Sequence, residues 1–138
     1  MATLTSTAAA STGVVRKNVG LNSISVTYDN STDISASATT ILMCKIPHGA
    51  TILDVYGTVS SGAATCPFTI GVQGDLSAFA TGGTLGGVLL RGTKNLPYDV
   101  SVSGDTNTQF MYVNMTVTPG TTTSIVEPKL TVIYTTDR

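Results

Sequence analysis

The stretch MYVNMTV, residues 111–117, alternates apolar and polar side chains without a break. This period of two is typical of a β-strand with one face in a hydrophobic core. The face expected to point inward carries Met111, Val113, Met115 and Val117. Tyr112, Asn114 and Thr116 are expected to point outward, and Pro119-Gly120 supplies the turn that ends the strand.

Shorter stretches with the same alternation lie on both sides of this strand. They are separated by Gly, Pro, Asn, Asp and Ser residues, which favour turns. The stretches are residues 24–28, 41–46, 52–59, 68–72, 98–102 and 130–135. About seven or eight short strands at this spacing predict an all-β fold, namely a single β-sandwich that is jelly-roll-like.

Two of these strands carry apolar residues on both faces. The first is expected to direct inward Leu42, Cys44 and Ile46, with Ile41 and Met43 opposite. The second is expected to direct inward Leu53, Val55 and Val59, with Ile52 and Tyr56 opposite. Both assignments assume uninterrupted alternation along the strand.

The N-terminal segment differs from the rest of the chain. Residues 1–23 open with a low-complexity Thr, Ser and Ala stretch and show neither a helical nor a strand period. Contacts with a partner would offset the entropy lost on ordering such a segment. We therefore expect an extended arm over residues 1–23 and a β-sandwich domain over residues 24–138. The residues expected to contact a partner or a neighbouring copy are Val14, Val15, Arg16, Lys17 and Val19.

A second irregular segment follows the strand at residues 68–72. Residues 76–80 are expected to form one helical turn, and the glycine-rich residues 82–87 to form a flexible excursion. The apolar residues that follow have no obvious place in a strand, which makes the segment a second contact candidate. Its candidate residues are Leu85, Val88, Leu89 and Leu90. The alternative is a loop that folds back on its own sandwich.

The charge content is low for a soluble domain. Charged residues are 11% of the 138, and the formal net charge is −1. A surface rich in uncharged hydroxyl groups suits close protein contacts within an assembly. The seven Lys and Arg are scattered, so neither nucleic acid nor a membrane is expected as a partner. The N-terminus has no cationic and apolar signal-peptide pattern, and synthesis in the cytoplasm is expected.

Few residues offer catalytic or metal-binding chemistry. His48 is the sole histidine, and it lies in Pro47-His48-Gly49, where a turn residue is the expected role. Cys44 and Cys66 are expected to be buried thiols, with a disulfide between them as the alternative. No catalytic residue, metal site or cofactor is therefore predicted, and the chain is not expected to be an enzyme.

The order of elements resembles a family of small virion proteins of tailed bacteriophages, the capsid decoration or cement proteins. The likeness covers about residues 24–135. It rests on residues 24–28, on the turn in Ile46-Pro47-His48-Gly49-Ala50, on the strand and turn at residues 68–75, on Leu96-Pro97-Tyr98 and on the closing strand at residues 129–134.

The resemblance implies a structural role on the phage head. A decoration protein binds the outside of the assembled shell and bridges subunits of the major capsid protein, which stabilises the shell. Such proteins often occupy local three-fold positions, so a homotrimer is the expected oligomer. The expected location is the capsid exterior of the virion, after synthesis in the host cytoplasm.

Two other interpretations remain open. The chain could be a tail or head-fibre module that binds host surface glycans, which would need an exposed aromatic cluster on one sheet or loops converging on a pocket. It could also be a small β-sandwich enzyme that uses His48. Substitution of His48 by Ala would then abolish activity without unfolding the chain.

Overall fold

The computed structural model describes residues 2–6, 9, 20–28, 38–59, 65–85, 89–101, 110–118 and 127–136, and the ten elements along them are strands. They are β1 (Ala2–Thr5), β2 (Gly20–Thr27), β3 (Thr39–Pro47), β4 (Thr51–Thr58), β5 (Thr65–Val72), β6 (Asp75–Leu85), β7 (Leu90–Arg91), β8 (Tyr98–Asp99), β9 (Phe110–Val117) and β10 (Lys129–Thr136). Among these residues, no helix is long and apolar enough to span a membrane.

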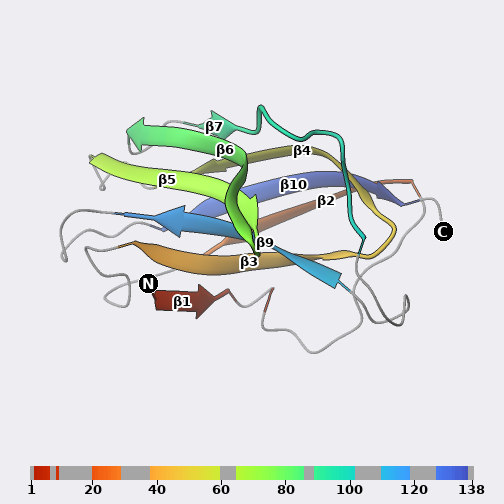
Figure 1. Ribbon diagram of the computed structural model, residues 1–138, viewed down its shortest axis with the longest axis horizontal. Coiled ribbons are helices and arrows are strands. Elements are labelled where there is room, and N and C mark those ends of the chain that lie inside the picture. The colour runs from red at the N-terminus through yellow and green to blue at the C-terminus, as the bar shows by residue number, and fades with distance from the viewer. Residues whose placement is uncertain are drawn as a thin grey trace.

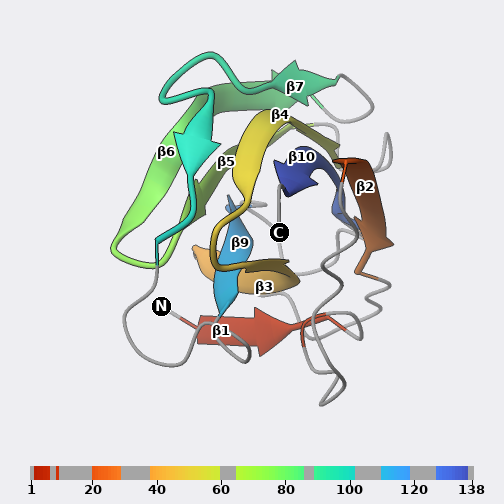
Figure 2. The same ribbon diagram turned by 90° about the vertical axis from the view of Figure 1, so that its right-hand side faces the viewer.

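The strands form two sheets that pack face to face (Figures 1 and 2). Sheet A has the order β1-β3-β9-β5-β6, and sheet B has the order β2-β10-β4-β7, with β8 also paired to β4. The pairs β2–β10, β3–β9, β4–β7 and β5–β6 are all antiparallel and nested along the chain. This nesting is the jelly-roll arrangement. The predicted all-β sandwich is confirmed.

β1 is the exception to the antiparallel pattern. Its residues Ala2–Thr5 pair in parallel with the first four residues of β3, at the edge of sheet A. The backbone N–H of Ser6 donates to the carbonyl of Leu42 at 2.9 Å, and the Ser6 hydroxyl donates to the carbonyl of Met43. The start of the predicted arm therefore extends the chain's own sheet. β2 begins at Gly20, four residues before the predicted strand.

The core lies between the sheets, and its side chains are almost completely excluded from solvent. The predicted alternation of β9 is confirmed, because Val113, Met115 and Val117 are buried there, and Met111 packs partly against them. β10 contributes Leu130, Val132 and Tyr134 to the same core. The segment after β7 closes one side of the sandwich. Gly92 N–H donates to Val55 of β4 at 2.8 Å, and Thr93 N–H donates to Phe79 of β6 at 2.9 Å.

The predicted faces of β3 are wrong for its first half. Ile41 and Met43 are fully buried, whereas Leu42 is half-buried on the outer face. The pairing with β9 shifts between Leu42 and Cys44, so one extra residue enters β3 there. Such a β-bulge resets the alternation, and beyond it Cys44 and Ile46 are buried as predicted.

A second bulge makes the predicted faces of β4 wrong at one end. The pairing with β10 passes from Asp54 directly to Ile52, which leaves Leu53 as the extra residue. Ile52 is consequently buried, and the Leu53 side chain remains 43% exposed. Val55 and Val59, on the far side of the bulge, are buried as predicted.

The predicted helical turn at residues 76–80 is also wrong, because these residues belong to β6. The register with β5 passes from Ile70–Ala80 to Val72–Asp75, so several residues of β6 are inserted opposite Gly71. A Cβ atom at Gly71 would lie 2.3 Å from the carbonyl oxygen of Asp75. Only glycine permits the start of β6 to cross the outer face of β5 this closely.

Candidate functional site

The outer faces of the two sheets are the surfaces from which this chain could contact a partner. On sheet B we define the sheet B face as the outward residues of β2, β10 and β4. Most of them carry hydroxyl or apolar side chains, and two are charged. The residues are Leu21, Ser23, Ser25, Thr27, Thr51, Leu53, Asp54, Tyr56, Thr58, Lys129, Thr131, Ile133 and Thr135. Leu21 is 72% exposed.

The carboxylate on the sheet B face is paired. Arg91 of β7 donates from Nη2 to Oδ2 of Asp54 at 2.5 Å, and its Nε donates to the same oxygen at 3.1 Å. The nearby carboxylate raises the pKa of the Arg91 guanidinium. Because the two charges offset each other, this part of the face presents little net charge to a partner.

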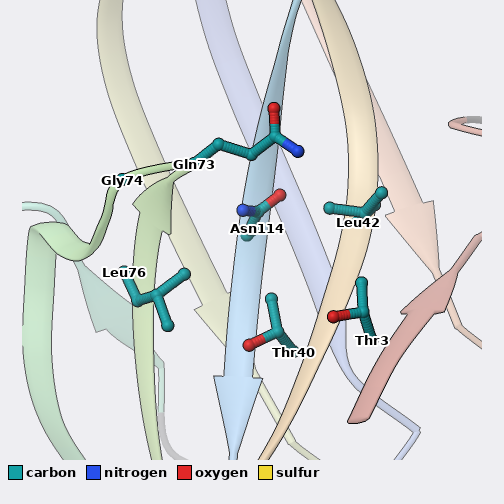
Figure 3. A pocket seen from close by; sticks show the side chains of 7 residues that line it. All are labelled: Thr3, Thr40, Leu42, Gln73, Gly74, Leu76 and Asn114. Atoms are coloured by element: carbon teal, nitrogen blue, oxygen red, sulfur yellow. The ribbon is translucent and has the colours of Figure 1, made fainter. Parts of the chain in front are cut away.

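The outer face of sheet A contains a pocket of about 420 Å³ (Figure 3). β1, β3 and β9 form its floor, and the turn between β5 and β6 forms its wall together with Leu76. We call it the Asn114 pocket. It is lined by Thr3, Thr40, Leu42, Gln73, Gly74, Leu76 and Asn114. The turn is positioned by the Thr69 hydroxyl, which donates to the carbonyl of Leu76 at 2.7 Å.

Asn114 lies in the middle of the group shown in Figure 3 and is only 1% exposed. Its side-chain oxygen Oδ1 has no hydrogen-bond partner within the described part of the chain. The hydroxyls of Thr40 and Thr116 beside it are paired to each other at 3.1 Å. A buried acceptor without a partner costs about 1–3 kcal/mol of stability, so native structures rarely retain one without a reason.

An aromatic pair continues the same face beyond the pocket. Phe110 and Tyr112 alternate with the inward residues of β9, and their ring centroids lie 5.1 Å apart in an edge-to-face arrangement. The ammonium group of Lys45 lies 4.6 Å from the centroid of Phe110. Tyr112 is two residues from Asn114, so the aromatic pair and the pocket are neighbours along one strand.

His48 lies in the turn between β3 and β4, as predicted, and is half-buried. It lines a separate depression of about 340 Å³ together with Thr51, Asp99 and Ser101. The Thr51 hydroxyl donates to the Asp99 carboxylate at 2.9 Å, and these residues are direct cross-strand partners of β4 and β8. Strand pairing accounts for this contact.

Cys44 is a free thiol and is fully buried in the core. Burial raises the pKa of the Cys44 thiol to about 12, because the thiolate would lose its hydration there. This agrees with the predicted buried thiol. The side chain of Cys66 lies outside the described residues.

The predicted contact residues are only partly described. Val14, Val15, Arg16, Lys17, Val19 and Val88 lie outside the described residues. Leu85 is the last residue of β6, and Leu89 is 58% exposed. Leu90 is half-buried, pairs with Gly57 and packs against the core. Their predicted role in contacts with a partner stays a prediction.

Sequence reasoning did not find the Asn114 pocket. Asn114 was expected to be an outward strand residue, and Leu42 was expected in the core. The pocket needs the bulge in β3 and the crossing of β6 over Gly71, and both are set by strand pairing between distant segments. The one signal in the sequence is a carboxamide in the middle of the most regular strand.

Comparisons with known proteins show a shared fold. No protein-family model matches the sequence, and no curated protein matches it. A chain of the capsid of Ralstonia phage GP4 has a similar structure, with a TM-score of 0.65, 13% identity and 99% of both chains covered. A chain of the cyanophage Pam1 capsid has a TM-score of 0.53 and 22% identity, over 91% of this chain and 88% of that one.

Proposed function

We propose that this chain is a structural protein of a bacteriophage head. The observation that carries the proposal is the match to a chain of the Ralstonia phage GP4 capsid over 99% of both chains. Because the match runs from end to end, it includes the strands of both sheets. The similar chain of the cyanophage Pam1 capsid supports the same role. At these identities the likeness is one of fold, so the role itself is inferred.

Within the head, we assign the chain to the decoration proteins. It would bind the outside of the shell and bridge neighbouring subunits of the major capsid protein. The layout of residues 24–135 supports this role, and so does the low content of charged residues. Many weak contacts made by many copies would together stabilise an assembled shell.

Two kinds of contact would hold the protein in place. The sheet B face offers Leu21 and Leu53 at its surface, and Leu89 is exposed just before β7. We assign these exposed leucines as anchors for the shell surface. The N-terminal arm of residues 1–23 would add contacts through Val14, Val15, Arg16, Lys17 and Val19. A homotrimer at local three-fold positions is the oligomer proposed.

Sedimentation with shells tests this function. The purified chain is mixed with heads of the virus that encodes it, prepared without the protein, and centrifuged. We expect the full chain to sediment with the heads, and a variant lacking residues 1–20 to stay folded but bind less. The double substitution of Arg16 and Lys17 by Ala, which keeps β1 and the length of the arm, should also bind less than the unaltered chain.

The outcomes separate the parts of the proposal. Equal binding by the full and truncated chains would contradict the role of the arm. A full chain that never sediments with heads would contradict the decoration function as a whole. Binding that the double substitution weakens as much as the deletion does would assign the arm contact to its two positive charges.

A further inference from the structure

We propose that the Asn114 pocket binds a neutral saccharide, held by the amides of Asn114 and Gln73 and the hydroxyls of Thr3 and Thr40. This would be a binding activity in addition to the structural role in the head. It does not depend on that role, since the pocket belongs to the isolated chain. The starting point is the unpartnered Oδ1 of the buried Asn114 side chain.

The lining of the pocket selects the chemistry of the ligand. None of its seven residues carries an ionisable side chain, so a charged ligand would be desolvated without a counter-charge. Amides and hydroxyls both donate and accept hydrogen bonds, which suits the hydroxyl groups of a sugar ring. Leu42 and Leu76 add apolar surface for the C–H groups of the ring.

The position of the pocket argues against an extended peptide as its occupant. Peptides that bind sheets usually add a strand at an open edge, where backbone N–H and C=O groups are free. The Asn114 pocket lies on a sheet face, over β3 and β9, which are each paired on both sides. Recognition there must come from side chains.

The size and surroundings of the pocket also fit a small glycan. Its volume of about 420 Å³ falls in the usual range for small-molecule sites, about 300–1,000 Å³. Phe110 and Tyr112 lie further along the same face of β9. An aromatic side chain at that place offers an apolar surface and, for Tyr112, a hydroxyl to a second sugar unit.

NMR titration of the ¹⁵N-labelled chain tests the proposal. The probes are the methyl glycosides of glucose, galactose, mannose and N-acetylglucosamine, with methyl glucuronide as the charged counterpart. We expect at least one neutral glycoside to shift the amide signals of residues 40–42, 73–76 and 114, and methyl glucuronide to leave them unchanged. A printed array of neutral oligosaccharides then extends the search to longer glycans.

Three variants assign the binding to the pocket. Asn114→Ala should weaken binding about tenfold, the typical effect of losing one well-buried hydrogen-bonding group. Gln73→Ala should weaken it several-fold, and because Gln73 is exposed at the rim, this variant keeps the test valid if Asn114→Ala does not fold. The matched control is Asn22→Ala on β2 of the other sheet, which should bind as the unaltered chain does.

Several results would overturn the proposal. One is the absence of any shift with every neutral glycoside and every arrayed glycan. Another is binding that Asn114→Ala and Gln73→Ala do not weaken. A third is a set of pocket signals that respond to capsid subunits and to no sugar, which would assign the pocket to a protein contact.

Discussion

At the scale of single residues, Asn114 is the position where stability and a binding role conflict. The Asn114 side chain is buried on the outer face of sheet A, beside two threonines whose hydroxyls hydrogen-bond to each other, and its Oδ1 has no partner among the residues that the structure describes. An apolar residue of similar size would remove that cost. Proteins commonly retain such costs where a ligand binds.

We therefore expect Asn114→Leu to stabilise the chain by about 1 kcal/mol, because the unpartnered acceptor is removed. For a domain of this size, the thermal unfolding midpoint should rise by about 3 °C. Calorimetry of the two proteins measures the change. Asn22→Leu, on the half-buried face of β2, is the control and should show no such rise. A clearly destabilised Asn114→Leu variant would mean that Asn114 is satisfied in solution.

Cys44 gives a prediction about pH. Its thiol pKa is raised from 9.0 to about 12 by burial, so the folded state retains a proton that the unfolded state releases above pH 9. The stability from this group is complete below pH 9 and is lost as the pH rises from 9 toward 12. Between pH 8 and pH 10 the loss should be about 1 kcal/mol.

The measurement is the free energy of unfolding against pH for the unaltered chain and for Cys44→Ala. The substitution costs packing at every pH, but the difference between the two curves should shrink above pH 9. Other groups titrate in both proteins and largely cancel in that difference. A difference that stays constant up to pH 11 would contradict the burial of this thiol.

At the scale of elements, the buried face of β9 could be predicted from its local pattern, whereas that of the first half of β3 could not. The alternation of β9 predicted its inward residues, because the bulge in the β3–β9 pair adds its extra residue to β3, and the pairing of β9 with β5 is uninterrupted. In β3, the consecutive apolar residues Ile41, Leu42 and Met43 fit either face. Pairing with β9 introduces a bulge that determines which of them are buried, and the local sequence does not show where that bulge lies.

The start of β6 shows a related limit. Leu76, Ala78 and Phe79 resembled a helical turn because their spacing fits one, yet pairing with β5 draws them into a strand. Tertiary pairing overrides local propensity here. The candidate pocket could not be predicted for the same reason, since its wall depends on how β6 crosses Gly71.

Alanine substitutions at the adjacent residues Ile52 and Leu53 test the bulge in β4. Ile52→Ala should destabilise the chain by about 2–5 kcal/mol, because a fully buried side chain leaves a cavity. Leu53→Ala should cost less than about 1 kcal/mol, because Leu53 is exposed. Urea unfolding of both variants gives the two values. A larger loss of stability for Leu53→Ala than for Ile52→Ala would contradict the bulge and support an uninterrupted alternation along β4.

At the scale of the whole molecule, the two sheets divide the surface into different chemistries. The sheet B face combines exposed leucine with hydroxyl groups, the exposed Lys129 and the Asp54 carboxylate that is paired to Arg91. The outer face of sheet A combines a neutral polar pocket with an aromatic pair. A jelly roll bound to a shell through one sheet would leave the other sheet free for a ligand.

We expect Leu21→Asp to weaken attachment to heads at least fivefold, because a carboxylate would be desolvated against the shell. Stability should change little, since the Leu21 side chain is exposed. Thr81→Asp, at an exposed position of β6 in sheet A, is the matched control. Binding curves from sedimentation measure both variants. Weaker attachment of Thr81→Asp alone would place the shell contact on sheet A.

The most direct test of the head-protein assignment is a cryo-electron microscopy reconstruction of the virion that the encoding virus produces. The account predicts density for this jelly roll on the outer surface of the head, with both sheets and β1 resolved and the sheet B face toward the shell. A virion whose head lacks this density, or that carries the chain in its tail, would contradict the account.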